Sequence, residues 1–358
     1  MKFISAIFFI LSILTASLAS GQDVEVYEGA VLSEDVTWRG SVLVRGSVVV
    51  APQATLRIDP GTLVRFAPSS TTQLATLVVQ GRIHAAGTLE RPIVFTPDSA
   101  KPARKSWGGI VLLSTEKRNQ LEHSRIEYVE NGIDVRFSTV TLKAVSIVHA
   151  QTGILSNDSV VQMTGSTISD SVTGMEIHNS EFDAKEITVV SCERGAVFGK
   201  SAVLLSASKI LNNLQSGLEA NECRIKISGG DISGNTLGAR MNGGEGQLLM
   251  TRFQRNKLTA LHIVGSRLKI QRCLFADNIQ DALRTEDSFA LLLNNSFSSN
   301  GGFNIYNAGT EAVSARQNWW GTTDQATISQ KNHDAASDKR SGAVQIFPWL
   351  NEKPLLMP

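Results

Sequence analysis

A period of 21 or 22 residues separates equivalent positions along most of this 358-residue sequence. In the stretch "DISGNTLG", Ile232 is followed three residues later by Asn235, which is followed three residues later by Gly238. The stretch "KILNNLQSG", one period earlier, gives the same order of residue types between Ile210 and Gly217. Because a fixed period of this size is the signature of repeat proteins, it constrains the fold more strongly than any local propensity does.

Three apolar columns keep this period over nine repeats. The first reads Ile126, Ile147, Ile168, Val189, Ile210, Ile232, Phe253, Phe275, Phe297 and Trp319. The second, five residues upstream, reads Leu121, Leu142, Met163, Ala184, Leu205, Ile227, Leu248, Ile270 and Leu292. The third reads Ile133, Ile154, Met175, Ala196, Leu218, Ala239, Leu261, Leu283 and Ile305. Within each repeat, apolar and polar residues alternate as in strands. The pattern predicts an all-β fold, a right-handed parallel β-helix of about twelve coils with three strands per coil.

Asparagine and glycine form two further columns. Five successive repeats carry asparagine three residues after the first apolar column, at Asn213, Asn235, Asn256, Asn278 and Asn300. Side-chain amides stacked at one turn form hydrogen bonds along the stack and to the turn backbone, so the column predicts an asparagine ladder. The glycine column predicts either a positive φ angle or a close approach of two backbones; it comprises Gly132, Gly153, Gly174, Gly195, Gly217 and Gly238.

The N-terminus has the features of a secretory signal peptide over residues 1–19. Lys2 precedes an apolar run that ends at Leu14, and Ser17 and Ala19 occupy the −3 and −1 positions of a cleavage site. About twelve apolar residues are too few to span a bilayer, which takes roughly 20. We therefore expect an exported protein, located in the periplasm, on the cell surface or outside the cell, with no transmembrane segment in its mature chain.

The rest of the chain divides into three regions. Residues 20–109 are expected to form wider initial coils with one insertion loop, residues 110–310 the regular repeats, and residues 311–358 a C-terminal cap. Within the cap, "TTDQATISQKNHDAA" predicts a short helix with Ile328 facing inward, followed by a last strand around "AVQIF". A cap is needed because an open strand edge at the end of the stack invites aggregation.

Cysteine, histidine and charge content argue against several kinds of site. Cys192, Cys223 and Cys273 form no zinc-binding or CxxC pattern, and at least one is expected to be a buried free thiol. The six histidines show no short metal-binding spacing, so no cofactor is implied. A net charge of +1 gives no overall attraction for nucleic acid.

The phrases "IDPGTLVRF" and "GTLERPIVFT", the coils with isoleucine and asparagine, and the closing "NWWG" and "FPWL" resemble a known family. These are the secreted bacterial right-handed parallel β-helix repeat proteins, related in fold to pectate lyases, polygalacturonases and the carbohydrate-binding and sugar-hydrolase repeat group. The resemblance covers nearly all of the mature chain and implies the fold. It does not imply one activity, because the scaffold carries lyases, hydrolases, epimerases and adhesins.

The catalytic signatures of these relatives are incomplete in this sequence. Of the polygalacturonase motifs, only Arg-Ile-Lys occurs, at residues 224–226, and chance is sufficient to explain one tripeptide. Asp170, Glu176, Glu181 and Asp183 cluster in sequence but occupy different columns, so they form no calcium-binding ladder. Coil length varies by only one residue between positions 121 and 305, which leaves no long loop to wall a catalytic cleft.

Two groups of residues are candidates for binding. The insertion "PDSAKPARKSWGG" places Lys101, Arg104 and Lys105 beside Trp107, a combination suited to an anionic sugar or a protein partner. The alternative, which we favour, is a solvated loop with Trp107 packed against the stack. The C-terminal tryptophans offer either a sugar-stacking platform or, as favoured here, an aromatic plug at the end of the stack; they are Trp319, Trp320 and Trp349.

These observations favour a monomeric, exported, non-catalytic β-helix that binds a surface polysaccharide or a cell-envelope protein along its flat faces. One alternative is a polysaccharide lyase, hydrolase or epimerase with an unrecognised site. Another is a purely structural component of the envelope or extracellular matrix.

Overall fold

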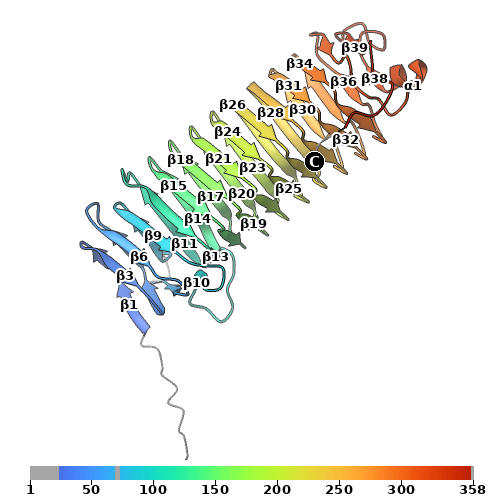
Figure 1. Ribbon diagram of the computed structural model, residues 1–358. Helices are drawn as coiled ribbons and strands as arrows, with labels where there is room; N and C mark the ends of the chain where they lie inside the picture. The colour runs from blue at the N-terminus through green and yellow to red at the C-terminus, as the bar shows by residue number, and fades with distance from the viewer. Residues whose placement is uncertain (1–23, 69–72, 356–358) are drawn as a thin grey trace, which may run out of the picture.

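A computed structural model describes residues 24–68 and 73–355, so the predicted signal peptide lies outside the described residues. The chain winds into a rod of stacked coils and runs from one end of the rod to the other (Figure 1). The rod is an all-β, right-handed parallel solenoid of about thirteen turns, one more than the dozen counted from the sequence. Within the described ranges, no helix is long and apolar enough to cross a membrane.

Every coil contributes one strand to a first sheet, in which all thirteen strands are parallel. Its strands are β1 (Val24–Glu28), β4 (Ser41–Arg45), β7 (Leu63–Ala67), β10 (Ile93–Pro97), β13 (Ser124–Glu127), β16 (Ser146–Val148), β19 (Thr167–Ser169), β22 (Thr188–Val190), β25 (Lys209–Leu211), β27 (Asp231–Ser233), β29 (Arg252–Gln254), β32 (Leu274–Ala276) and β35 (Ser296–Ser298).

The other 26 strands line two further sides of the rod, which we call the second and third faces. The second face contains β2 (Val31–Leu32), β5 (Ser47–Val50), β8 (Thr76–Val79), β11 (Trp107–Leu113), β14 (Val129–Arg136), β17 (Thr152–Asn157), β20 (Thr173–His178), β23 (Arg194–Gly199), β30 (Leu261–Val264), β33 (Leu283–Glu286), β36 (Ile305–Asn307) and β38 (Asn332–His333). Two long strands, β26 (Ser216–Ser228) and β28 (Leu237–Leu249), continue from the second face into the third.

The third face carries the remaining strands, again paired in parallel with the next coil. They are β3 (Val36–Trp38), β6 (Thr55–Ile58), β9 (Arg82–Ala86), β12 (Asn119–Glu122), β15 (Thr139–Lys143), β18 (Val160–Thr164), β21 (Glu181–Lys185), β24 (Ala202–Ser206), β31 (Arg267–Gln271), β34 (Phe289–Leu293), β37 (Val313–Ser314) and β39 (Val344–Gln345).

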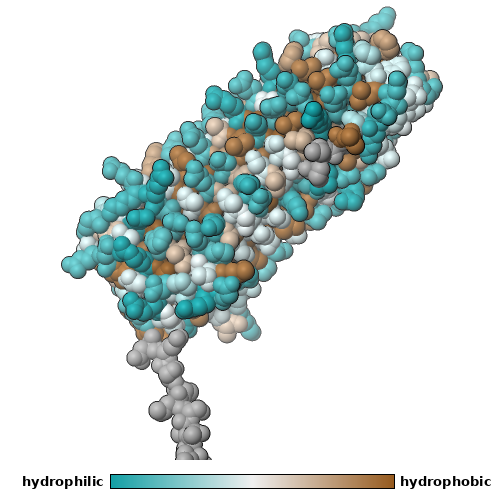
Figure 2. All heavy atoms as spheres, in the orientation of Figure 1, coloured by the Kyte–Doolittle hydropathy of each residue, from teal (hydrophilic) through white to brown (hydrophobic). Residues whose placement is uncertain are grey.

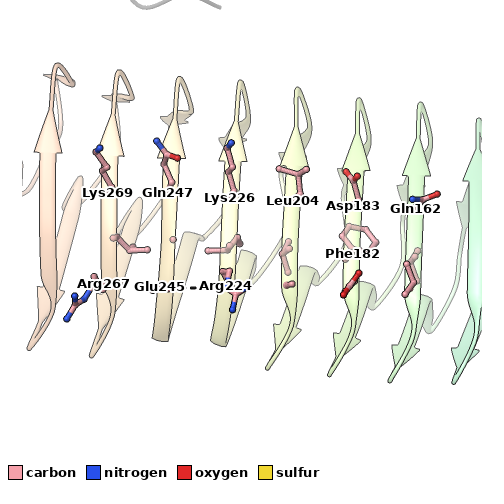
Figure 3. Close-up of a pocket in the computed structure, with 18 of the residues that line it drawn as sticks. Gln162, Phe182, Asp183, Leu204, Arg224, Lys226, Glu245, Gln247, Arg267 and Lys269 are labelled. Atoms are coloured by element: carbon pink, nitrogen blue, oxygen red, sulfur yellow. Dashed lines mark ion pairs between the residues drawn. The ribbon is translucent and has the colours of Figure 1, made fainter.

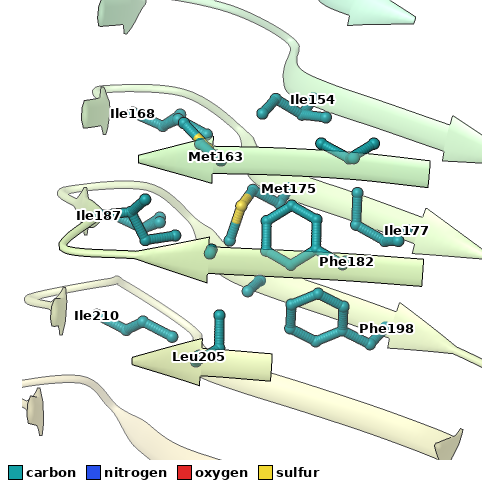
Figure 4. Packing of buried hydrophobic residues seen from close by; sticks show 14 of the residues in the cluster. Ile154, Met163, Ile168, Met175, Ile177, Phe182, Ile187, Phe198, Leu205 and Ile210 are labelled. Carbon is teal, nitrogen blue, oxygen red and sulfur yellow. The ribbon is translucent and has the colours of Figure 1, made fainter. Parts of the chain in front are cut away.

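Alternating residues of every face point inward and stack on their equivalents in the next coil. Figure 4 shows this packing in the middle of the rod, where aliphatic, methionine and phenylalanine side chains from the three sides meet. Towards the C-terminus the first apolar column becomes a stack of parallel rings, with centroid distances of 4.9, 5.0 and 4.8 Å along Phe253, Phe275, Phe297 and Trp320. Offset ring stacking adds to the area that these side chains bury.

The last ring of this stack corrects the sequence prediction, which placed Trp319 in the column. Ser296 pairs with Trp319, so the partner of Phe297 is Trp320. The final step is therefore one residue longer than the period of the repeats, and Trp319 lies half-buried beside the stack.

The predicted asparagine ladder is confirmed. The Oδ1 atom of Asn256 accepts hydrogen bonds from the backbone N–H and the Nδ2 of Asn235, at 3.0 and 3.3 Å. The Nδ2 of Asn256 donates in turn to Oδ1 of Asn278 at 3.1 Å and to the carbonyl of Ile232 at 3.1 Å. The ladder continues to the backbone N–H of Cys192, which donates to Asn213. Buried amides that satisfy one another and the turn backbone remove the cost of unpaired polar groups.

Two further ladders occupy the other turns. Each backbone N–H of Ser138, Ser159 and Ser180 donates at 3.1 Å to the hydroxyl oxygen of the serine one coil later, ending at Ser201. A second asparagine pair joins Asn295 to Asn318, whose side chains hydrogen-bond at 2.9 Å. Neither ladder was predicted from the sequence.

The glycine column results from close approach and not from positive φ. A Cβ atom on Gly153 would lie 2.5 Å from the carbonyl oxygen of Gly174, so no larger residue fits between these coils. Positive φ angles occur instead at turn residues that are mostly not glycine, such as His149 (55°) and Asn212 (54°).

All three cysteines are buried and free, which agrees with a packing role. Burial raises the pKa of the Cys192 thiol to about 11 and that of the Cys273 thiol to about 12. Burial likewise raises the pKa of Cys223. Thiols held protonated in this way are poor nucleophiles.

At the C-terminal end of the rod, helix α1 (Gln325–Gln330) follows the coils, as predicted (Figure 1). Asp324 caps it by accepting a hydrogen bond from the backbone N–H of Thr327 at 2.8 Å. Ile328 faces inward and is buried. The helix and the strand pair β37–β39 cover the end of the apolar stack.

Candidate functional site

The insertion between β10 and β11 does not present its tryptophan to solvent. Trp107 is fully buried and stacks on Phe66 with ring centroids 3.9 Å apart, and its Nε1 donates to the carbonyl of Glu127. This corrects the proposal that Trp107 contacts a ligand, because its ring lies inside the rod. The three basic residues are exposed, and Arg104 is tied to the carbonyl of Asp170 at 2.9 Å. The loop therefore lies along the turns of neighbouring coils.

Trp320 is also unavailable to a ligand. Only 4% of its surface is exposed, because it ends the phenylalanine stack. Trp349 is half-buried against the same core, next to the exposed ring of Phe347. The structure thus places Trp320 in the plug and corrects its assignment as a binding residue.

A groove lies on the outer side of the third face. It has a volume of about 790 Å³ and crosses the strands from β18 to β34, parallel to the rod axis (Figure 3). Its sides are two rows of outward-pointing residues. The upstream row is Val160, Glu181, Ala202, Arg224, Glu245, Arg267 and Phe289, and the downstream row is Gln162, Asp183, Leu204, Lys226, Gln247, Lys269 and Leu291.

The groove follows directly from strand geometry. In a strand, residues i and i+2 point to the same side, so each coil gives one residue to each row, about 7 Å apart along the strand. The residue between them points into the core, and its backbone forms the floor of the groove. Phe182 and Ile225 are such floor residues, with 1% and 3% of their surface exposed. Long side chains on both rows make walls without any inserted loop.

Most charges of the groove are exposed and free to meet a ligand. Arg224 and Glu245 form an ion pair at 3.6 Å, but their side chains are 79% and 63% exposed, so the pair is weak. The guanidinium of Arg267 lies 5.6 Å from the ring centroid of Phe289. Lys226 and Lys269 form no ion pair with any residue in the described ranges. Figure 3 shows both lysines on the same row.

A smaller notch adjoins the groove at the corner between the second and third faces, with a volume of about 360 Å³. Lys200 and Glu222, 3.9 Å apart, lie on one side of it, and Gly244 lies on the other. Since Ala202, Arg224 and Glu245 line both hollows, the notch widens the groove at its centre.

The structure separates the four carboxylates that cluster in the sequence. Glu181 and Asp183 both project into the groove from β21. Glu176 lies on the second face beside His178, at 3.4 Å, and Asp170 occupies a turn. In the part of the chain that the structure describes, no group of three or more His, Cys, Asp or Glu side chains is arranged to hold a metal ion.

Two clusters of charged residues on the second face are paired within the face. Asp134 is buried, and both of its carboxylate oxygens accept hydrogen bonds from Arg136, at 3.0 and 2.6 Å. Towards the C-terminus, Glu286 contacts His262 at 3.1 Å and Arg284 at 3.2 Å. Burial lowers the pKa of His262 below its usual value, although the nearby carboxylate opposes the change. Burial raises the pKa of Glu286, but hydrogen bonds from Arg284 and His262 outweigh it, and the net pKa is lowered.

Comparison with known proteins identifies the fold. Residues 29–135 match the family model of the pectate-lyase-like β-helix domain, and residues 178–319 match that of the right-handed β-helix region. No curated protein sequence matches the chain.

Solved structures of similar shape share little sequence with the chain. A point mutant of the periplasmic alginate epimerase AlgG is 10% identical, over 87% of this chain and 77% of its own, with a TM-score of 0.47. The A-module of the Azotobacter vinelandii mannuronan C-5 epimerase AlgE4 is 13% identical, over 75% and 89%, with a TM-score of 0.37. Tailspike protein 3 of bacteriophage CBA120 is 11% identical, over 86% and 54%, with a TM-score of 0.38. These likenesses concern the fold alone. With its two family matches and its parallel solenoid, the chain belongs to the right-handed parallel β-helix proteins of the pectate-lyase-like type.

Proposed function

We propose that the protein binds an extended polysaccharide along the groove of the third face and does not cleave it. The observation that carries this proposal is the groove itself, which repeats the same two outward positions on successive coils. Coils are spaced by about 4.8 Å, as neighbouring strands are in any sheet. A linear polymer whose units advance by a similar distance meets an equivalent pair of side chains at every unit.

The chemistry of the two rows suits sugars. Both rows contain polar side chains that donate and accept hydrogen bonds as well as apolar ones such as Leu204 and Leu291, and the ring of Phe289 is 57% exposed at one end. An exposed ring offers an apolar surface to the C–H face of a sugar, while the neighbouring charged groups meet its hydroxyl or carboxylate substituents. The groove residues include no histidine, tyrosine or cysteine.

Location and partner are part of the proposal. A predicted signal peptide at residues 1–19 supports function outside the cytoplasm, where surface polysaccharides are found. The exposed loop residues Lys101 and Lys105 lie away from the groove and remain available to a cell-envelope protein. We expect the polysaccharide to be the main ligand, because the groove crosses the strands from β18 to β34.

A second candidate is a glycoside hydrolase centred on Glu181 and Asp183. Both carboxylates project from one strand into the groove, and glycosidases use two carboxyl groups separated by roughly 5 to 9.5 Å. Release of oligosaccharides by the wild-type protein, abolished in Glu181→Gln and Asp183→Asn, would establish this activity. We expect no product release.

Binding is tested by affinity electrophoresis and calorimetry against neutral and acidic polysaccharides. The double variant Lys226→Ala with Lys269→Ala is expected to lose most of its affinity. A matched control, Lys209→Ala with Lys257→Ala, removes two exposed lysines outside the groove and should bind like the wild type. If no polysaccharide binds at millimolar sugar, or if both variants bind equally well, the groove is not the site.

A further inference from the structure

The last five of the seven coils that line the groove carry a nearly symmetrical order of side chains; the coil before them carries Glu181 and Asp183. Going from β24 to β34, the outward pairs are apolar, basic, acidic with amide, basic, and apolar again. The pairs are Ala202 with Leu204, Arg224 with Lys226, Glu245 with Gln247, Arg267 with Lys269, and Phe289 with Leu291. The groove therefore has two basic pairs, and one coil separates them.

The middle coil differs from both neighbours in charge. The strand register aligns Glu245 directly between Arg224 and Arg267, and Gln247 directly between Lys226 and Lys269. The Glu245 carboxylate approaches Arg224 at 3.6 Å. It repels an anionic group placed on the same coil, while its oxygens and the amide of Gln247 accept and donate hydrogen bonds to neutral sugar groups.

The distance between the two basic pairs determines the distance between the anionic groups of a polymer that can bind both pairs. Two coils are separated by about 10 Å, twice the strand spacing. An extended pyranose chain advances by about one strand spacing per sugar, so two coils correspond to two sugars. A polyuronate with a carboxylate on every sugar places one of them opposite Glu245. A polymer with one anion per disaccharide places its neutral sugar there.

We propose that the groove is selective for an acidic polysaccharide with an alternating disaccharide repeat, in which an anionic sugar alternates with a neutral one. The inference rests on the proposed function and names the class of polymer. The basic pairs at residues 224–226 and 267–269 bind successive anionic sugars, and the middle coil binds the neutral sugar between them. The apolar ends contact the next neutral sugars, with the exposed ring of Phe289 as a stacking surface.

The test compares two carboxylate polymers at equal chain length. Hyaluronate oligosaccharides carry a carboxylate on every second sugar, and oligogalacturonates carry one on every sugar. Calorimetry with the full mature chain is expected to show at least about tenfold tighter binding of the hyaluronate oligosaccharide per mole, although it carries fewer charges. Equal or tighter binding of the oligogalacturonate overturns the inference and leaves the proposed function intact. If neither polymer binds, and no neutral polysaccharide binds either, both the inference and the proposed function are wrong.

A variant of the middle coil tests the cause of the selectivity. Glu245→Lys makes three successive coils basic, so it is expected to raise the affinity for oligogalacturonate about tenfold and to reverse or abolish the preference. Glu186→Lys is the matched control, since it makes the same charge change at an exposed turn outside the groove and should keep the wild-type preference. If both variants change the two affinities alike, overall charge and not position governs binding, and the inference fails.

Discussion

Charged residues in the groove of the third face are arranged differently from two charged clusters of the second face. In those clusters, carboxylates are bonded to bases of the same face, as Asp134 is to Arg136 and Glu286 is to His262 and Arg284. In the groove, the two lysines have no partner among the described residues, and the one ion pair between lining residues is largely exposed. Both faces have the same strand register and nearly the same coil length, so the fold alone does not produce the difference.

This difference in pairing determines which charged residues a ligand can bind without breaking an existing ion pair. A paired charge contributes its hydrogen bonds to the fold, and a ligand has to break that pair before it gains a new one. An unpaired, exposed charge gains a partner on binding at little cost. Figure 2 shows hydrophilic residues spread over the visible side of the rod. The pairing of charges distinguishes the groove from the two clusters of the second face.

The largest expected effect is on binding at the third face. The double charge reversal Lys226→Glu with Lys269→Glu should weaken the binding of an acidic polysaccharide about 100-fold, or about 2.7 kcal/mol, because each reversal replaces an attraction with a repulsion. Calorimetry at low ionic strength measures the loss. The midpoint of urea unfolding should not change, since neither lysine bonds to another described residue; a large shift of that midpoint would show that the lysines support the fold.

A smaller effect, on stability, is expected at the second face. Asp134→Asn keeps the shape of the side chain but removes the negative charge of the carboxylate. In the wild type, two nitrogens of Arg136 donate hydrogen bonds to this carboxylate. We expect a loss of about 1.5 kcal/mol in the free energy of unfolding, limited by the exposure of the arginine. Urea denaturation measures it. Polysaccharide affinity should remain that of the wild type, and a parallel loss of affinity would contradict the division between the faces.

Added salt should weaken polysaccharide binding at the third face more than it lowers the free energy of unfolding. Raising the sodium chloride concentration from about 0.05 to 0.5 M shortens the screening length severalfold, and binding through exposed charges should weaken about fivefold, or ~1 kcal/mol. The same titration should leave the unfolding free energy of the wild type nearly constant, because the Asp134 carboxylate is buried. Salt-independent binding would mean that apolar contacts, and not charges, hold the polymer.

The smallest effect is a dependence of stability on pH at the second face. Burial lowers the pKa of His262 in the fold, so the unfolded chain binds the proton more readily, and stability should fall as the pH drops from 6.5 through the lower folded pKa. Arg240 and Arg284 disfavour the protonated imidazole, while Glu286 favours it. His262→Gln should show less loss of thermal stability between pH 7 and 5. Since the pKa of Glu286 is also lowered, a second loss is expected at more acidic pH in both proteins.

The sequence was sufficient to predict the solenoid because its period is visible in residues that the fold must bury. Apolar columns and the run from Asn213 to Asn300 tolerate few substitutions, and both appear where expected. The serine ladder was missed because serine is common at the surface and its column is broken by Cys223 and Gly244. The error at Trp319 arose where the period lengthens by one residue.

The groove could not be predicted from columns, since outward residues need not resemble one another. One signal was present: Arg224-Ile225-Lys226 is followed two coils later by Arg267-Leu268-Lys269. Taken alone, the first tripeptide resembled chance, and only the strand register shows that the two align on one face. The buried state of Trp107 depends on Phe66, 41 positions away, which no local pattern reveals.

The carbonyl oxygen of Gly174 lies so close to Gly153 that a side chain there would not fit, and each coil is paired in register with the next. A gene duplication that inserted one whole repeat would therefore lengthen the groove by one strand spacing and leave the rest of the rod in register. Insertions of any other length would break the stack. Evolution of such a molecule can thus change the length of the groove only in whole steps.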